Sequence, residues 1–200
     1  FLAASGTPYA AQFPGSNLAG FSSGGYTYFT SGPTGLFANG SIDPSSGFVI
    51  TFNPARLIFP VPFTYGNSLT HISRFQYDTT LSSIDYRFVQ YTEQGFNADG
   101  YGSLQLPTGT YSSTLRVKET DLGIDSIYIN MGPLGWQPLP GYTPSPTQST
   151  NFMWLRNGNG ALLLNFSADS LGLFATDGAS YYLYAGPAGI EANTLEESKN

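Results

Sequence analysis

The sequence predicts an all-β protein, an antiparallel β-sandwich of jelly-roll-like type with about ten to twelve strands. Gly (24), Pro (14), Tyr (14) and Phe (15) are plentiful, whereas charged residues make up only 10% of the chain. Apolar residues alternate with polar ones in short stretches bounded by Gly, Pro, Asn and Ser, and no window keeps the 3.6-residue spacing of a helix. Strands and turns therefore account for this chain better than helices do.

Each alternating stretch is one expected strand. In chain order the expected strands are 26–29, 47–52, 56–59, 73–78, 85–92, 101–106, 110–118, 126–131, 151–156, 161–167, 172–175 and 180–185. Asn-Gly and Asp-Gly pairs favour tight hairpin turns because they tolerate positive φ angles. We therefore expect hairpin turns at 157–160, at Asp99-Gly100 and at Asp177-Gly178.

The segment 132–148 is rich in proline, which cannot donate to a strand ladder, so it predicts an ordered loop or an exposed strap. The length and apolar content fit one β-sandwich domain over 1–189. The last residues, 190–200, carry charged side chains and no aromatic residue. This change in composition predicts a linker or tail that leads out of the domain.

The charge balance argues against several classes of partner. Seven Lys and Arg against 13 Asp and Glu give a net charge of -6, which repels nucleic acid. No apolar run approaches the roughly 20 residues that span a bilayer, so membrane insertion is not expected. The small-residue start, Phe1-Leu-Ala-Ala-Ser-Gly, predicts that an N-terminal segment has been removed, as in exported proteins. The chain has no Cys, so no disulfide is formed.

Residues for catalysis are sparse. His71 is the only histidine, and no nucleophile-elbow or zinc-binding spacing surrounds it, which predicts a structural role. Asp85 and Glu93 share a face if 85–93 is one strand, but they are then about 26 Å apart, too far for a glycosidase pair. The sequence does not exclude a pair of carboxylates that folding brings together. A glycoside hydrolase-like enzyme is therefore kept as an alternative to a noncatalytic protein.

Two kinds of ligand have candidate residues. Asn97 and Asp99, like Asp121 and Asp125, offer the oxygen atoms that calcium favours, although turn chemistry is the simpler explanation for both pairs. We therefore expect no cofactor, with a structural calcium as the alternative. Aromatic rings that stack on sugars are the second kind, and the candidates are Trp136, Tyr142 and Trp154.

The segment Asn97-Ala-Asp-Gly-Tyr-Gly-Ser-Leu-Gln-Leu-Pro-Thr-Gly-Thr-Tyr-Ser-Ser-Thr-Leu-Arg-Val-Lys118 resembles one found in uncharacterised exported proteins of Bacteroidetes that carry a C-terminal type IX secretion sorting domain. Phe13-Pro-Gly-Ser-Asn17, Phe59-Pro-Val-Pro-Phe-Thr-Tyr-Gly66, Phe152-Met-Trp154 and Ala188-Gly-Ile-Glu191 are similar as well. The resemblance implies export, an extracellular or cell-surface location and a sorting domain that is absent here. It implies no activity, and the chain departs from the pattern at 151–160.

The same resemblance implies O-glycosylation at Asp-Ser or Asp-Thr pairs, with Thr79, Ser126 and Ser170 as acceptors. The plain alternative is that these pairs serve turns and strand ends.

Taken together, these features predict a noncatalytic extracellular structural module, a subunit of a cell-surface layer, adhesin or self-assembling fibre. Its expected partners are copies of itself or other cell-surface proteins. A carbohydrate-binding module is the first alternative, and exposed aromatic residues in a row beside Asn, Gln or Asp would distinguish it.

Overall fold

The computed structural model describes residues 1–156, 162–168 and 174–181. These residues form 12 antiparallel strands and three short 3-10 turns, with no α-helix among them. The predicted all-β, antiparallel, sandwich-like fold and its number of strands are confirmed.

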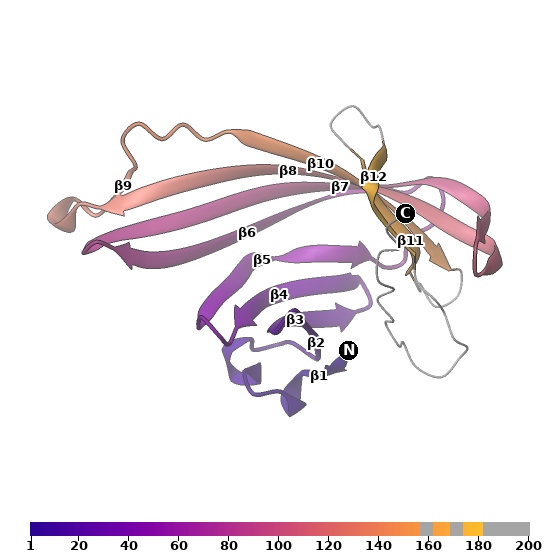
Figure 1. Ribbon diagram of the computed structural model, residues 1–200, viewed down its shortest axis with the longest axis horizontal. Helices are drawn as coiled ribbons and strands as arrows, with labels where there is room; N and C mark the ends of the chain where they lie inside the picture. Colours follow the sequence, from indigo (N-terminus) through magenta and orange to yellow (C-terminus); the bar gives the residue numbers. More distant parts are fainter. Residues whose placement is uncertain (157–161, 169–173, 182–200) are drawn as a thin grey trace. The chain divides into compact units, whose positions relative to one another are not determined.

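Figure 1 labels the strands in chain order. Their bounds are β1 Leu2–Ala3, β2 Leu18–Ser22, β3 Gly25–Gly32, β4 Gly35–Asp43, β5 Phe48–Pro60, β6 Ser68–Leu81, β7 Ile84–Leu106, β8 Gly109–Asn130, β9 Trp136–Pro138, β10 Pro146–Arg156, β11 Leu162–Ala168 and β12 Phe174–Tyr181. The 3-10 turns are η1 Ala4–Gly6, η2 Ala10–Gln12 and η3 Gly132–Leu134.

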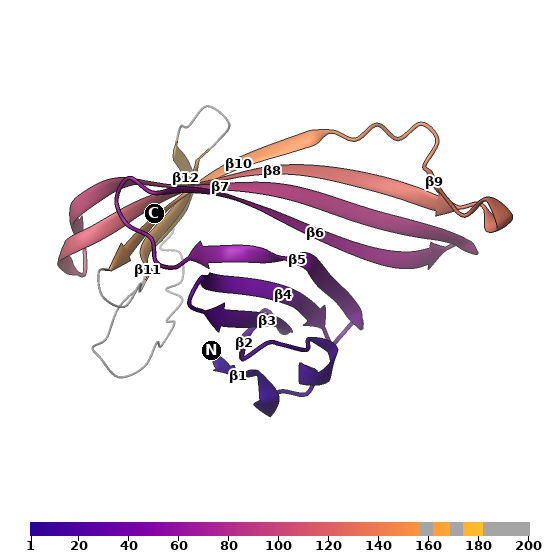
Figure 2. The ribbon, with the colours of Figure 1, turned by 180° about the vertical axis from the view of Figure 1, so that it is seen from behind.

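The strands are connected as a meander. Each strand pairs with the next one in sequence, except that β8 is bonded to both β10 and the short strand β9. Figures 1 and 2 show the neighbouring ribbons from opposite sides. This order differs from the Greek-key order of a jelly roll. Tight turns favour a meander because they place each strand beside the next one in sequence. Between β6 and β7, for example, Ser82 and Ser83 both have positive φ, as a two-residue hairpin turn requires.

Two predicted turns are wrong. Asp99-Gly100 lies inside β7, and Asp177-Gly178 lies inside β12. At Gly100 a Cβ atom would lie 3.2 Å from the Cβ of Arg116, so this glycine serves a close approach between strands. Predicted strands merge accordingly: 85–92 and 101–106 are parts of β7, and 110–118 and all but the last residue of 126–131 are parts of β8.

The hairpin predicted around 157–160 is confirmed as a strand pair. β10 and β11 pair antiparallel, with Phe152 opposite Phe166 and Trp154 opposite Leu164, while the turn residues lie outside the described residues. Strands β1, β2, β4 and β9 were not expected from the sequence. In β4 the residues Gly35, Asn39 and Gly40 interrupt the apolar alternation on which strand prediction depends.

The chain divides into two compact units. The first unit comprises Phe1–Pro62, Thr70–Gln94 and Asp121–Gln148; the second comprises Phe63–Leu69, Gly95–Thr120 and Ser149–Asn200. The single domain over 1–189 stays a prediction. The predicted tail 190–200 lies outside the described residues.

The core of the first unit forms where the N-terminal segment, with η1 and η2, packs against strands β2 to β4. Its fully buried members are Ala4, Phe13, Ala19, Tyr28 and Ile42. The rings of Phe13 and Tyr28 stack with centroids 4.5 Å apart. The hydroxyl of Tyr28 accepts a hydrogen bond from the backbone N–H of Tyr9 and lies 2.7 Å from the hydroxyl of Thr7. One buried tyrosine thus holds the N-terminal segment onto the sheet.

The second unit has fully buried residues as well, which are Phe96, Ala98 and Val117 on β7 and β8 and Leu163 on β11. Backbone hydrogen bonds from Gly66 N–H to the carbonyl of Ala98, and from Ala98 N–H to that of Asn67, tie the segment 63–69 to β7.

Gly40 in β4 leaves the space that the ring of Phe13 fills. A Cβ atom there would overlap with Phe13 Cε1 and with the carbonyl oxygen of Ile50. We expect Gly40→Ala to lower the free energy of unfolding by about 1–3 kcal/mol, because the core must shift. The matched control is Gly32→Ala, where nothing lies within 4 Å, and it should stay within about 1 kcal/mol of the parent. Urea unfolding measures both, and equal losses would contradict this explanation.

Candidate functional site

The first unit contains a sheet made by β6, the first half of β7 and the second half of β8, and cross-strand contacts give its register. Between β6 and β7, Asp78 pairs with Arg87. Between β7 and β8, the side chain of Gln90 donates to Asp125. Since side chains alternate between the faces of a strand and directly opposite residues share a face, these contacts sort the residues into two faces.

The inner face is defined here as the one directed at β5, and it is polar where it contacts the second half of that strand. Its members His71, Ser73, Thr92, Gln94 and Asp121 include side chains that are almost fully inaccessible, with exposed fractions of 1% for Ser73 and 0% for Gln94. A sheet of this kind normally packs apolar side chains inward.

The polar inner face is explained by the hydrogen bonds that β5 needs. His71 Nε2 lies 2.8 Å from the carbonyl oxygen of Ala55. Gln94 Nε2 donates to the carbonyl oxygen of Leu57 at 2.9 Å. The side chain of Arg56 forms an ion pair with Asp121. The inner face therefore supplies three polar contacts to three consecutive residues of β5.

β5 needs these contacts because it leaves the ladder with β6 early. It pairs with β6 only at Thr51 and Phe52, and Pro54, which has no N–H group, follows soon after. Buried backbone carbonyls must find donors, so side chains of the sheet replace the missing backbone partners. The contact of His71 agrees with the structural role predicted for it.

The outer face is the opposite one, and it mixes apolar side chains with charged and polar ones. Ile72, Tyr91 and Leu122 belong to it, with exposed fractions of 42%, 36% and 42%, and Val89 and Ile124 are half-buried beside them. Around these residues, at the end of the sheet that packs against β5, apolar side chains are exposed and polar ones are buried, which is the reverse of the usual pattern of an antiparallel sheet. This outer face is the candidate functional site.

Sequence reasoning missed the outer face. Along 91–94 the chain reads Tyr-Thr-Glu-Gln, and along 71–74 it reads His-Ile-Ser-Arg. A two-residue alternation is visible in both, but it does not say which of the two sets is covered. The sequence thus showed that these segments are strands with two different faces, but not which face is buried.

One end of the outer face carries a cluster around Arg87. Its guanidinium forms two hydrogen bonds with Asp78, both of 2.8 Å, and stacks over the ring of Trp136 at 4.2 Å from the centroid. The hydrogen bonds from Arg87, with its positive charge, hold the pKa of Asp78 below its ordinary value, against a smaller opposite effect of burial. One face of the Trp136 ring is thus occupied by Arg87.

The proline-rich segment is only in part the predicted loop. Trp136–Pro138 forms β9, in which Trp136 lies opposite Asn130 and Pro138 opposite Tyr128 of β8. The short strand lies off the main path of the sheet, where proline is tolerated because it need not donate to a further strand. Tyr142 is half-buried, and its hydroxyl donates to the carbonyl of Asp125 at 3.3 Å.

Trp154 belongs to the second unit. Its ring lies 5.0 Å from that of Phe166 and 5.9 Å from the guanidinium of Arg116. Of the three predicted sugar-stacking residues, only Trp136 and Tyr142 are in the first unit, and each has a contact with another residue of the chain. All three remain candidates for ligand binding.

The structure does not bring the calcium candidates Asn97 and Asp99 together with further acidic side chains among the described residues. Asp99 accepts a hydrogen bond of 2.8 Å from Arg116 Nε, and Asn97 is exposed on β7. Among the residues that the structure describes, no three His, Asp or Glu side chains gather as a metal centre requires. In the same part of the chain, no helix is long and apolar enough to cross a membrane.

The glycosylation candidates occupy strands. Thr79 is half-buried on β6 and Ser126 is half-buried on β8, whereas Ser170 lies outside the described residues. Asp85 and Glu93 both lie on β7, which runs without interruption between them.

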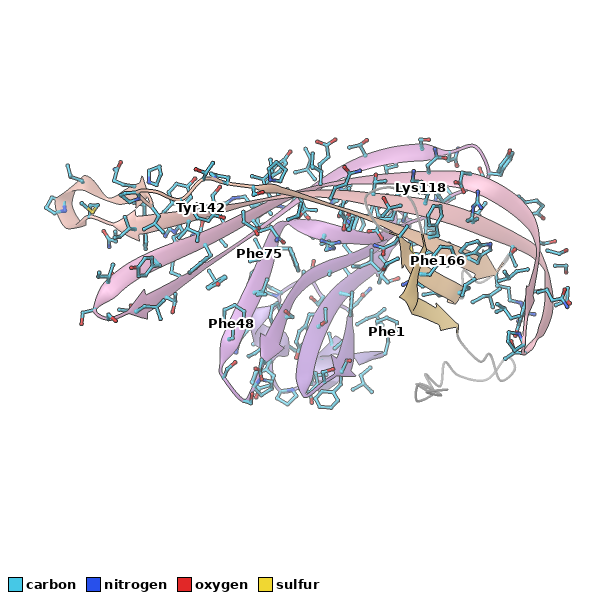
Figure 3. All side chains as sticks on the ribbon, turned by 45° about the horizontal axis from the view of Figure 1, so that its top comes forward. Phe1, Phe48, Phe75, Lys118, Tyr142 and Phe166 are labelled. Atoms are coloured by element: carbon cyan, nitrogen blue, oxygen red, sulfur yellow. The ribbon has the colours of Figure 1, made fainter. Side chains whose placement is uncertain are left out.

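Aromatic rings continue along β5, β6 and β7 on the side of the inner face. Phe48 packs edge-on against Tyr77 at 4.8 Å, and Tyr77 stacks on Phe88 at 4.8 Å. Phe75 lies 5.7 Å from Phe52; Figure 3 labels Phe48 and Phe75. Because such pairs stabilise a sheet by about 0.5–1.5 kcal/mol beyond burial, this row explains much of the aromatic content near β6.

Gln94 offers a test of the polar inner face. We expect Gln94→Ala to lower the free energy of unfolding by about 1–3 kcal/mol, because a buried carbonyl loses its donor. Gln137→Ala is the matched control, since Gln137 Nε2 makes the same kind of bond, 2.9 Å to the carbonyl of Leu134, at an exposed site. The control should lose no more than about 0.5 kcal/mol. A comparison by urea unfolding that gives equal losses would show that burial of this bond does not matter.

The Asp78–Arg87 pair predicts a pH dependence. A carboxyl whose pKa is lowered by folding stabilises the fold above its ordinary pKa of 3.8, and this contribution disappears as the pH falls through the lower folded value. Because the Asp78 side chain is 47% exposed, the effect should stay below about 1 kcal/mol. Asp78→Asn should therefore be less stable than the parent at pH 6 and equal to it near pH 2 in urea unfolding. A difference that persists at low pH would assign the effect to packing.

No family model, no curated protein and no solved structure matches the chain, so the outer face is interpreted from its own residues alone.

Proposed function

We propose that the chain is a noncatalytic extracellular structural module that acts by self-association, as a subunit of a cell-surface layer, adhesin or fibre. The observation that carries this proposal is local and concerns the end of the sheet of β6 to β8 that packs against β5, where apolar side chains are exposed and polar ones are buried. Its outer face offers Ile72, Tyr91 and Leu122 to solvent while polar side chains are buried behind them.

The free energy available at this face is modest. Full burial of one large apolar side chain contributes about 1.5–3 kcal/mol, and because these three side chains are only 36–42% exposed, about two fifths of that is left to gain for each. Clustered exposed apolar residues mark interaction sites more often than scattered ones do. An open sheet supports the same function, because the strand order of the described residues ends at β1 and β12 without closure and open sheets readily add further strands.

The extracellular setting is supported by the resemblance of 97–118 to exported proteins of Bacteroidetes. Low charge and a net charge of -6 are compatible with that setting. O-glycosylation at Thr79, Ser126 and Ser170 belongs to the same proposal and rests on the same resemblance.

A carbohydrate-binding module is the second candidate, and one observation favours it. Tyr91, Tyr128 and Trp136 share the outer face with the amide of Asn130, which is the combination of rings and polar groups that sugars use. Arg87 occupies one face of the Trp136 ring, so a sugar would have to use the other face or Tyr91.

Light scattering and negative-stain microscopy over a concentration series test the first candidate. We expect dimers or larger regular assemblies whose fraction rises with concentration. A strict monomer at every concentration would contradict self-association. Pull-down with insoluble polysaccharides then tests the second candidate, with Trp136→Ala and Tyr91→Ala as the variants expected to weaken binding.

A further inference from the structure

The outer face also carries two charged side chains for which the described residues provide no ion pair. Arg74 of β6 donates to the side-chain oxygen of Gln76 at 2.9 Å, and neither Arg74 nor Glu93 is among the ion pairs Arg56–Asp121, Arg87–Asp78 and Arg116–Asp99. Glu93 is exposed on β7.

The register places these two charges beside the exposed apolar residues. Asp78 opposite Arg87 sets the pairing of β6 with β7, so Arg74 lies opposite Tyr91 and Ile72 lies opposite Glu93. On β8, Leu122 follows as the neighbour of Glu93, because Gln90 lies opposite Asp125. The end of the outer face opposite the Arg87 cluster thus holds three exposed apolar residues interspersed with one positive and one negative group.

We propose that this outer face is the surface by which two copies of the chain associate, face to face about a two-fold axis, with Arg74 of one copy against Glu93 of the other. This inference rests on the proposed function and adds the surface and its geometry. A two-fold interface uses the same patch twice, so the patch must complement itself. One positive and one negative group beside apolar residues meet that condition.

A second copy fits this face better than an oppositely charged partner would. A partner chosen by charge would need a face of predominantly one sign, whereas Arg74 and Glu93 offer both signs in adjacent positions. Like charges brought together across an interface cost several kcal/mol. A two-fold arrangement that places Arg74 against Glu93 is therefore preferred over one that places Arg74 against Arg74 or Glu93 against Glu93.

The size of the face limits the affinity. Nine residues of strand and three strands cover roughly 26 Å by 14 Å, or about 360 Å² per partner, which is less than half of the roughly 800 Å² of a standard specific interface. Association through this face alone should therefore be weak and dependent on concentration.

Charge reversal tests the proposed pairing. Arg74→Glu alone and Glu93→Arg alone should each weaken self-association at least tenfold in sedimentation velocity, because each creates like-charge contacts at both ends of the two-fold interface. An equimolar mixture of the two variants should restore association, since the reversed charge of one variant then faces the opposite, reversed charge of the other. Lys118→Glu, a reversal in the second unit, is the control and should change nothing.

The apolar part of the face has a matched pair of variants. Leu122→Asp should abolish association, whereas Leu134→Asp, at a leucine that is 71% exposed in η3, should leave it intact. Circular dichroism of each variant confirms that the fold is retained.

The outcomes separate this inference from the proposed function. If the parent chain associates while the charge and leucine variants behave like it, the outer face is not the interface and self-association stands. If the single charge variants are monomeric and mixing does not restore association, the Arg74–Glu93 pairing is wrong. If the parent chain is monomeric at every concentration, the proposed function itself fails.

Discussion

The structure of the first unit depends on how the second half of β5 satisfies its backbone. β5 leaves the ladder with β6 after Phe52, and the carbonyl groups of Ala55 and Leu57 then accept hydrogen bonds from side chains of the facing sheet. A carbonyl buried without a donor costs about 1–3 kcal/mol. The sheet of β6 to β8 therefore has to direct polar side chains at β5, and His71 and Gln94 are the ones that do so.

This constraint has a consequence on the other side of the sheet. Because side chains alternate along a strand, neighbours of an inward polar residue point outward, and here they are Ile72, Tyr91 and Leu122. This end of the outer face thereby exposes three apolar side chains where solvent contact would favour polar groups. Exposed apolar side chains lower the solubility of a protein, and the proposed self-association would bury them.

Arginine organises both units in a similar way. In the first unit Arg87 bonds to Asp78 and lies over Trp136. In the second unit Arg116 bonds to Asp99 and lies near the ring of Trp154. Cation–π contacts of this kind contribute about 0.5–1 kcal/mol at exposed sites. Both tryptophans of the chain thus have a structural contact, which leaves Tyr91 as the exposed ring of the outer face.

The sequence alone determined the all-β class, most strand segments and the pairing of β10 with β11, because alternation and turn residues are local properties. It could not determine that Asp99-Gly100 lies within a strand, since the close approach of Arg116 from β8 to Gly100 is a contact between residues distant in sequence. Nor could it determine the candidate site. A two-residue period defines two faces and leaves open which one is covered, and only the path of β5 across the sheet decided that the polar set is inside.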